Sequence, residues 1–191
     1  MSDHCFSLID VAASPAEAKK LGPRVVECLV GQRLIEPKLS EERVLGGLGY
    51  PPGPACAKAY SAGRSRKFWE LVTSGVEVHS ERWVNTSGFT VFETAECPRC
   101  AHLSGEEYLD EVGASVEAFY ESGKVPKIAC GECGAKSRLL DWKCKPALGF
   151  VNLAVVFWNW PSFDAKGWKL DIPALLSKTI GRPLVPTYGH V

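Results

Sequence analysis

Two pairs of closely spaced cysteines constrain this sequence more than any other feature. The first pair is Cys97 and Cys100 in a C-P-R-C motif, and the second is Cys130 and Cys133 in a C-G-E-C-G motif, with 29 residues between the pairs. A C-x-x-C turn brings two thiolates close enough to share one ion, and two such turns complete the tetrahedral shell of a structural zinc. The sequence therefore predicts one structural zinc ion bound by all four thiolates.

The residues that follow each pair refine this prediction. Gly134 suits a backbone with positive φ, which lets N–H groups point at a sulfur, whereas the first pair is followed by Ala101 and His102. Because four thiols are available, we expect His102 to lie beside the metal shell or on the surface. The alternative is two redox pairs, but neither pair opens a helix after a strand. The other four cysteines are expected in the core; they are Cys5, Cys28, Cys56 and Cys144.

Over residues 89–142 the two motifs resemble the zinc-ribbon class. As a whole, the chain is similar to proteobacterial proteins that combine an N-terminal βα unit, a zinc knuckle and an FWNWP-type segment, here at 157–161. Some of those proteins are labelled as transporter ATPases. This sequence has no G-x-x-x-x-G-K-[ST] phosphate loop, so that activity is not expected here.

With 191 residues, the chain is expected to form a single domain over 1–191. We predict a βα unit and a Gly/Pro loop within 1–72, the loop occupying 46–54, where seven of nine residues are Gly or Pro. Residues 73–191 should form a sheet with a zinc-bound subdomain inserted at about 89–142. The predicted fold class is α+β: a mixed or antiparallel sheet with packed helices and an inserted four-cysteine zinc-ribbon-like subdomain.

Local signals predict several elements within this fold. Ser14 and Glu17 form a capping box, and the helix after it should kink or break at Gly22-Pro23 because proline lacks an N–H. The period-two segment 76–81 should pair with 89–95 in a hairpin. The apolar run 149–158 reads as one central strand buried on both faces.

A second helix is predicted between the cysteine pairs. Ser104 and Glu107 suggest its capping box, and Gly123 its end. The apolar stripe that should face the sheet contains Leu109, Val112, Val116 and Phe119. The opposite side carries six carboxylates: Glu106, Glu107, Asp110, Glu111, Glu117 and Glu121.

The charge distribution disfavours nucleic acid as a partner. Lysine plus arginine equals aspartate plus glutamate, at 22 each, and the segment 101–129 has a net charge of −4. A surface that contacts phosphates should be positive. The segment 136–145 is the best basic patch, and we interpret its lysines as screening the thiolates. A role as a nucleic-acid-associated zinc-ribbon protein therefore ranks second, as the alternative function.

Membrane and secretion signals are not found. The longest apolar run is far shorter than the ~20 residues that span a bilayer, and the sequence after Met1 has no basic start followed by an apolar core. We therefore expect a cytoplasmic protein with no membrane partner and with reduced thiols. Nothing in the sequence indicates an oligomeric state.

One enzyme pattern was weighed in detail. His79 and Glu81 followed by Cys97 and Cys100 match the H-x-E … C-x-x-C set of zinc deaminases. Glu96 stands where the deaminase signature has proline, His79 lies in an alternating strand, and the second cysteine pair would have no role. Motifs of other hydrolases are absent from the sequence, and a four-thiolate zinc has no open position to activate water. We therefore expect no enzyme, with deaminase-like or hydrolase activity as the third hypothesis.

The leading hypothesis is a non-catalytic, zinc-stapled protein-binding protein, such as a bacterial immunity or adaptor protein. Its acidic helix suits a basic protein partner, with Glu106, Glu107 and Asp110 as contact residues. Tyr50 and Trp160 are the candidate aromatic anchors, because tyrosine and tryptophan dominate binding hot spots.

Overall fold

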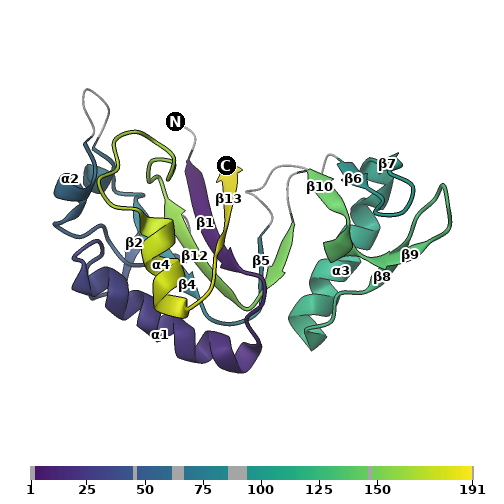
Figure 1. Ribbon diagram of the computed structural model, residues 1–191, viewed down its shortest axis with the longest axis horizontal. Helices are drawn as coiled ribbons and strands as arrows, with labels where there is room; N and C mark the ends of the chain where they lie inside the picture. The colour runs from purple at the N-terminus through teal and green to yellow at the C-terminus, as the bar shows by residue number, and fades with distance from the viewer. Residues whose placement is uncertain (1–2, 45–46, 62–66, 86–93, 146–147, 191) are drawn as a thin grey trace.

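The computed structural model describes residues 3–44, 47–61, 67–85, 94–145 and 148–190. The fold is α+β, as predicted, and every strand pairing between its named strands is antiparallel. Figure 1 shows two lobes side by side, a larger one that contains both termini and a smaller one that contains helix α3. None of the helices in the described residues is both long and apolar enough to cross a membrane.

The larger lobe is a four-stranded sheet with helices on one face. Its strand order is β13-β1-β12-β4. The strands are β1 (His4–Asp10), β4 (Gly75–His79), β12 (Leu153–Trp158) and β13 (Val185–His190). Helices α1 (Pro15–Gly31) and α4 (Ile172–Ile180) pack on this sheet, and their apolar faces share one core with Leu8, Val155 and Phe157. The sheet is thus the platform of the larger lobe.

The apolar run 149–158 forms two strands where one was expected. Asn152 separates β11 (Gly149–Val151) from β12, and its side-chain amide donates to the Ala13 carbonyl at 2.9 Å. Strand β12 is buried along nearly its whole length between β1 and β4, which explains its apolar sequence. Asn159, with φ of 58°, ends it and hydrogen-bonds through its amide to Asp3 and Thr73.

Helix α1 begins with the predicted capping box, because the Ser14 and Glu17 side chains each accept a hydrogen bond from the backbone N–H of the other residue. The helix does not break at Gly22-Pro23 but continues to Gly31. Gly22 has a packing role here: a Cβ at this position would lie 2.6 Å from the Ser80 Cβ. The glycine therefore lets the helix approach the sheet closely.

The hairpin predicted from 76–81 and 89–95 does not form over the part of it that the structure describes. Strand β4 pairs with β12 instead, with Val78 opposite Val155. The described end of the expected return strand, β6 (Thr94–Glu96), pairs with β10 (Lys143–Lys145) and β7 (Leu103–Ser104) in the smaller lobe. Residues 89–93 lie outside the described residues. Strand β4 therefore pairs with a strand that is distant in sequence, because β12 is an inner strand of the sheet and β4 covers the edge that β1 leaves open.

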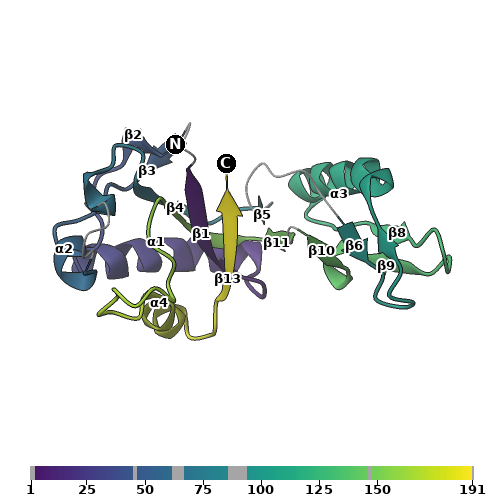
Figure 2. The same cartoon turned by 90° about the horizontal axis from the view of Figure 1, so that it is seen from above.

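The smaller lobe has its own core and leaves the larger lobe between two paired strands. Strands β5 (Trp83–Asn85) and β11 pair with each other, and the chain between them builds the second core around Phe119, Leu139 and Trp142. Helix α3 (Leu109–Ser122) packs on this core and ends at Gly123, which has a positive φ of 74°. Figure 2 shows α3 as one layer of this lobe, above β8 (Lys127–Ala129) and β9 (Lys136–Arg138).

Two details of the α3 prediction need correction. Ser104 lies in β7 and makes no cap; a 3₁₀ turn over Glu106–Tyr108 leads into the helix instead. The apolar stripe holds for Val112, Val116 and Phe119, but Leu109 is 40% exposed, and Tyr108 is the buried residue at this end. The stripe faces the core of the smaller lobe rather than the main sheet.

The remaining elements are short. They are β2 (Ser40–Val44), β3 (Gly47–Gly49), α2 (Cys56–Ala59) and single 3₁₀ turns at Phe68–Glu70 and Leu139–Asp141. The second of these 3₁₀ turns directly follows β9.

Candidate metal centre

The four predicted ligands meet at one point of the smaller lobe. The Sγ atoms of Cys97, Cys100, Cys130 and Cys133 all lie within 4.8 Å of one another. Across the two motifs, Cys97 and Cys133 are 4.0 Å apart and Cys100 and Cys130 are 3.7 Å apart. Zn–S bonds of about 2.3 Å in a tetrahedron require S···S edges of about 3.8 Å. The two distances across the motifs are close to this value, so the cluster could hold a metal ion.

The two motifs fold into equivalent turns. In the first, the Ala101 N–H donates to the Cys97 carbonyl at 3.0 Å; in the second, the Gly134 N–H donates to the Cys130 carbonyl at 2.8 Å. Gly134 has the positive φ predicted from the sequence, at 67°, and Ala101 adopts the same conformation with φ of 59°. A left-handed alanine costs about 1 kcal/mol or more. This strained alanine lets the first turn match the second despite its sequence.

Each turn contributes one buried and one exposed sulfur. Cys97 and Cys130 are buried, and Cys100 and Cys133 are exposed. The Tyr108 hydroxyl, which the sequence reasoning did not single out, fixes the second turn: it donates to the Ala129 carbonyl at 2.8 Å and accepts from the Gly131 N–H at 2.7 Å. The sulfur cluster is therefore tied to the start of α3.

The metal-free thiols differ in acidity. Desolvation opposes ionisation of Cys97, but the backbone N–H groups of Cys100 and Arg99 outweigh it and lower the pKa of Cys97 to about 7. The His102 N–H favours the thiolate of Cys100, yet desolvation and the neighbouring sulfurs raise the pKa of Cys100 to about 12. One thiolate therefore forms readily, while a second is held protonated until a cation balances the charge.

The deaminase pattern is not assembled. His79 lies on β4 in the larger lobe, where its ring stacks on Trp83 with centroids 5.1 Å apart and its Nε2 lies 3.3 Å from Glu77 Oε2. Among the described residues, the only cluster of potential metal ligands is the one formed by the four cysteines. His79 and Glu81 are not part of it.

The residues predicted to bind a partner lie in different environments. Glu106, Glu107 and Asp110 are exposed together at the start of α3. Tyr50 is half-buried and lines a groove between α1 and β4. Trp160 corrects the sequence-based hypothesis, because its side chain is 0% exposed within the main core. It is a packing residue and offers no surface to a partner.

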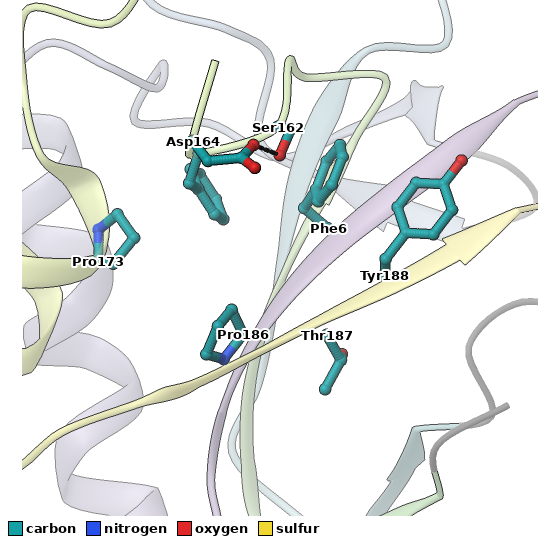
Figure 3. A pocket seen from close by; sticks show the side chains of 8 residues that line it. Phe6, Ser162, Asp164, Pro173, Pro186, Thr187 and Tyr188 are labelled. Carbon is teal, nitrogen blue, oxygen red and sulfur yellow. Dashed lines mark hydrogen bonds between the residues drawn. The ribbon is translucent and has the colours of Figure 1, made fainter. Parts of the chain in front are cut away.

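The cleft shown in Figure 3 lies beside edge strand β13 and has an aromatic and proline lining. Phe6, Tyr188 and Pro186 come from the sheet, and Pro173 comes from the first turn of α4. Its single carboxylate, Asp164, accepts a hydrogen bond from the Ser162 hydroxyl. No histidine or cysteine is among its described lining residues.

Comparisons with protein families, curated proteins and solved structures find no significant match to this chain.

Proposed function

We propose that this protein is a non-catalytic, zinc-stapled protein-binding protein of the immunity or adaptor type, whose smaller lobe presents an acidic helix to a basic protein partner. The observation that carries this proposal is the combination of a four-sulfur cluster with an exposed acidic helix built on the same small core. A bound metal would stabilise the smaller lobe, and the core of this lobe would keep the acidic helix in position.

Zinc is the metal that the ligand set favours. Four cysteine sulfurs in a tetrahedral arrangement suit Zn²⁺ or an iron–sulfur centre, and zinc needs no further component. All eight cysteines are unpaired, which fits a reducing, cytoplasmic location. Elemental analysis should find one zinc per chain. Less than half an equivalent, with no iron in its place, would contradict the structural metal.

Metal retention should depend steeply on pH. Metal binding requires all four sulfurs as thiolates, whereas the metal-free cluster keeps protons, because the pKa of Cys100 is raised to about 12. Each proton that the metal displaces makes the apparent affinity fall about tenfold per pH unit on acidification. We therefore expect zinc to be lost as the pH falls below neutral, measured with a chromogenic chelator. The chelator's affinity for zinc also changes with pH and is corrected for. If zinc retention then did not change between pH 7 and pH 5, thiolate ligation would be contradicted.

The acidic side chains are exposed, and the helix that carries them is anchored in the core of the smaller lobe. Glu106, Glu107, Asp110, Glu111, Glu117 and Glu121 are all exposed on the face of the 3₁₀ turn and α3 that points away from the core. The Gly105 N–H donates to Glu107 Oε1 at 2.9 Å, and this hydrogen bond lowers the pKa of the Glu107 carboxyl. Because Tyr108 and Phe119 anchor the helix in the second core, little ordering remains to be done on binding.

Charge reversal of this surface should slow association with the partner. The partner is first isolated by affinity purification with the zinc-loaded chain as bait. The triple variant Glu106→Lys, Glu107→Lys and Asp110→Lys should then lower the association rate about tenfold or more and flatten its salt dependence, because steering by opposite charges is lost. Stopped-flow or surface-plasmon measurements at several salt concentrations give both quantities.

A matched control separates local recognition from net charge. Glu27, Glu36 and Glu41 are exposed acidic residues of the larger lobe, so reversing all three changes the net charge by the same amount. This control should leave the association rate near that of the parent protein. Zinc content verifies that the α3 variant is folded, since Glu107→Lys also removes the hydrogen bond to Gly105. Equal on-rates for the parent and the α3 variant would show that this helix does not contact the partner.

A further inference from the structure

A basic groove lies beside the sulfur cluster on the side of the lobe away from the exposed face of α3. It has a volume of about 440 Å³. Its cationic lining comes from three segments of chain: Arg99 from the first cysteine turn, Lys127 from β8, and Lys136 and Arg138 from β9. Figure 2 shows these two strands and α3 as separate layers of the lobe.

The register of β8 and β9 puts the strand cations on one face. Lys127 is opposite Arg138, and Ala129 is opposite Lys136, so all four side chains point the same way; Ile128 points to the core. Like charges directly opposite each other destabilise an antiparallel pair. The positive charges of this hairpin therefore oppose its folding. Binding sites often carry such a cost, and a ligand of opposite charge then removes the repulsion.

Among these cations only Arg138 forms an ion pair within the described part of the chain; its partner, Asp141, also lines the groove and attracts Lys127 at longer range. Arg138 forms a two-point contact with Asp141, with its terminal nitrogen 2.9 Å from Oδ1 and its Nε 3.3 Å from Oδ2. No carboxylate of the described residues lies within ion-pair distance of Arg99, Lys127 or Lys136. Three positive charges thus border one small hollow. Screening of the thiolates would account for positive charge near the sulfurs but requires no hollow between the cations.

We propose that this groove binds the phosphate of a phosphate monoester. A monoester carries nearly two negative charges and three acceptor oxygens on one compact group, which matches three cations converging from separate segments. Nucleic acid fits less well, because no aromatic residue is among the lining residues to stack a base and the same lobe carries the acidic α3. The proposal goes beyond the function proposed above, since it concerns a different face of the lobe and a ligand of opposite charge.

The test uses the zinc-loaded full chain and three probes. Calorimetric titration compares inorganic phosphate, a short peptide containing phosphoserine together with its unphosphorylated form, and a single-stranded thymidine oligonucleotide. The phosphopeptide or inorganic phosphate should bind, and the unphosphorylated peptide should not. Tighter binding of the phosphopeptide assigns a modified protein as the source of the phosphate; equal binding of the two assigns a free anion.

Substitutions locate the bound phosphate. Arg99→Ala and Lys136→Ala should each weaken binding about tenfold or more, as expected for loss of a charge-assisted hydrogen bond. Lys124→Ala, an exposed lysine of the same lobe outside the groove, should have no effect. Zinc content, measured on every variant, reports whether these cations serve the metal site instead. The proposal is overturned if neither phosphate probe binds at millimolar concentration, or if the oligonucleotide binds more tightly than both. It is also overturned if the groove variants lose zinc while Lys124→Ala weakens phosphate binding as much as they do.

Discussion

Replacing Cys100 with serine is expected to unfold the smaller lobe and leave the larger lobe folded. The two lobes have separate cores, and the sulfur cluster belongs to the smaller one, where Cys97 and Cys130 are buried among its apolar residues. The strands on either side of the cluster have only two or three residues each, as in β6, β8 and β9. Such short strands give little stability by themselves. A bound metal would supply the rest.

The expected size of this effect is large. Structural zinc binding in small domains contributes about 10–16 kcal/mol of apparent free energy at neutral pH, and where the site forms only on folding, this binding energy is folding energy. Loss of one of four thiolates should therefore abolish stable metal binding. Removal of the metal from the parent protein with a chelator should have the same structural result, and the α3 segment should lose its protection from hydrogen exchange.

Hydrogen exchange followed by peptide gives the measurement, because it reports the two lobes separately. Peptides from 94–145 should exchange rapidly in the Cys100→Ser variant, while those from β1, β12 and α1 stay protected. Cys28→Ser is the matched control: Cys28 lies outside the cluster and accepts a hydrogen bond from the Thr179 hydroxyl, a contact that serine can also make. If Cys100→Ser exchanged and melted like the parent protein, the cluster would not stabilise the lobe.

Features that depend on a few adjacent residues could be predicted from the sequence. The capping box at Ser14, the left-handed glycine at Gly123 and the two cysteine turns all formed as expected. In each case the chemistry is local: a side chain satisfies a nearby N–H, or a glycine accepts a positive φ. The pairing of ligands within each C-x-x-C turn belongs to the same group, whereas the contacts between the two turns join sulfurs of residues 30 and 36 positions apart.

Features that depend on distant partners could not be predicted. The segment 76–81 shows an alternating pattern that fits any strand with one buried face, so the pattern cannot choose between 89–95 and β12 as its partner. No sequence motif predicted the role of Tyr108, because its hydroxyl bonds two backbone groups some twenty residues further along the chain. The basic groove depends likewise on the register of β8 with β9.

Trp160 is the clearest example, because its sequence context fits both a surface anchor and a core residue. Asn159 turns the chain with a positive φ of 58°, so the alternation of β12 does not continue to the next residue. The Trp160 ring is thereby directed into the core, where it lies 4.7 Å from Phe68 and 5.1 Å from Phe157 between ring centroids. It also stacks on Trp168 at 6.0 Å. Trp160 therefore packs between rings of its own stretch of chain and Phe68, which comes from a distant part of the sequence.

Trp160→Ala should accordingly destabilise the larger lobe by about 3–5 kcal/mol, the usual cost of deleting a large buried aromatic ring. Trp160→Phe should cost much less, because a ring remains and the indole Nε1–H, which has no acceptor among the described residues, is removed. Trp158→Ala is the control on the same segment: Trp158 is half-buried and donates to Glu77, so its loss should cost less than that of Trp160. Urea unfolding of the zinc-loaded variants, followed by hydrogen exchange of β1 and β12, measures all three. A Trp160→Ala variant within about 0.5 kcal/mol of the parent, the usual range for surface substitutions, would contradict a packing role for this side chain.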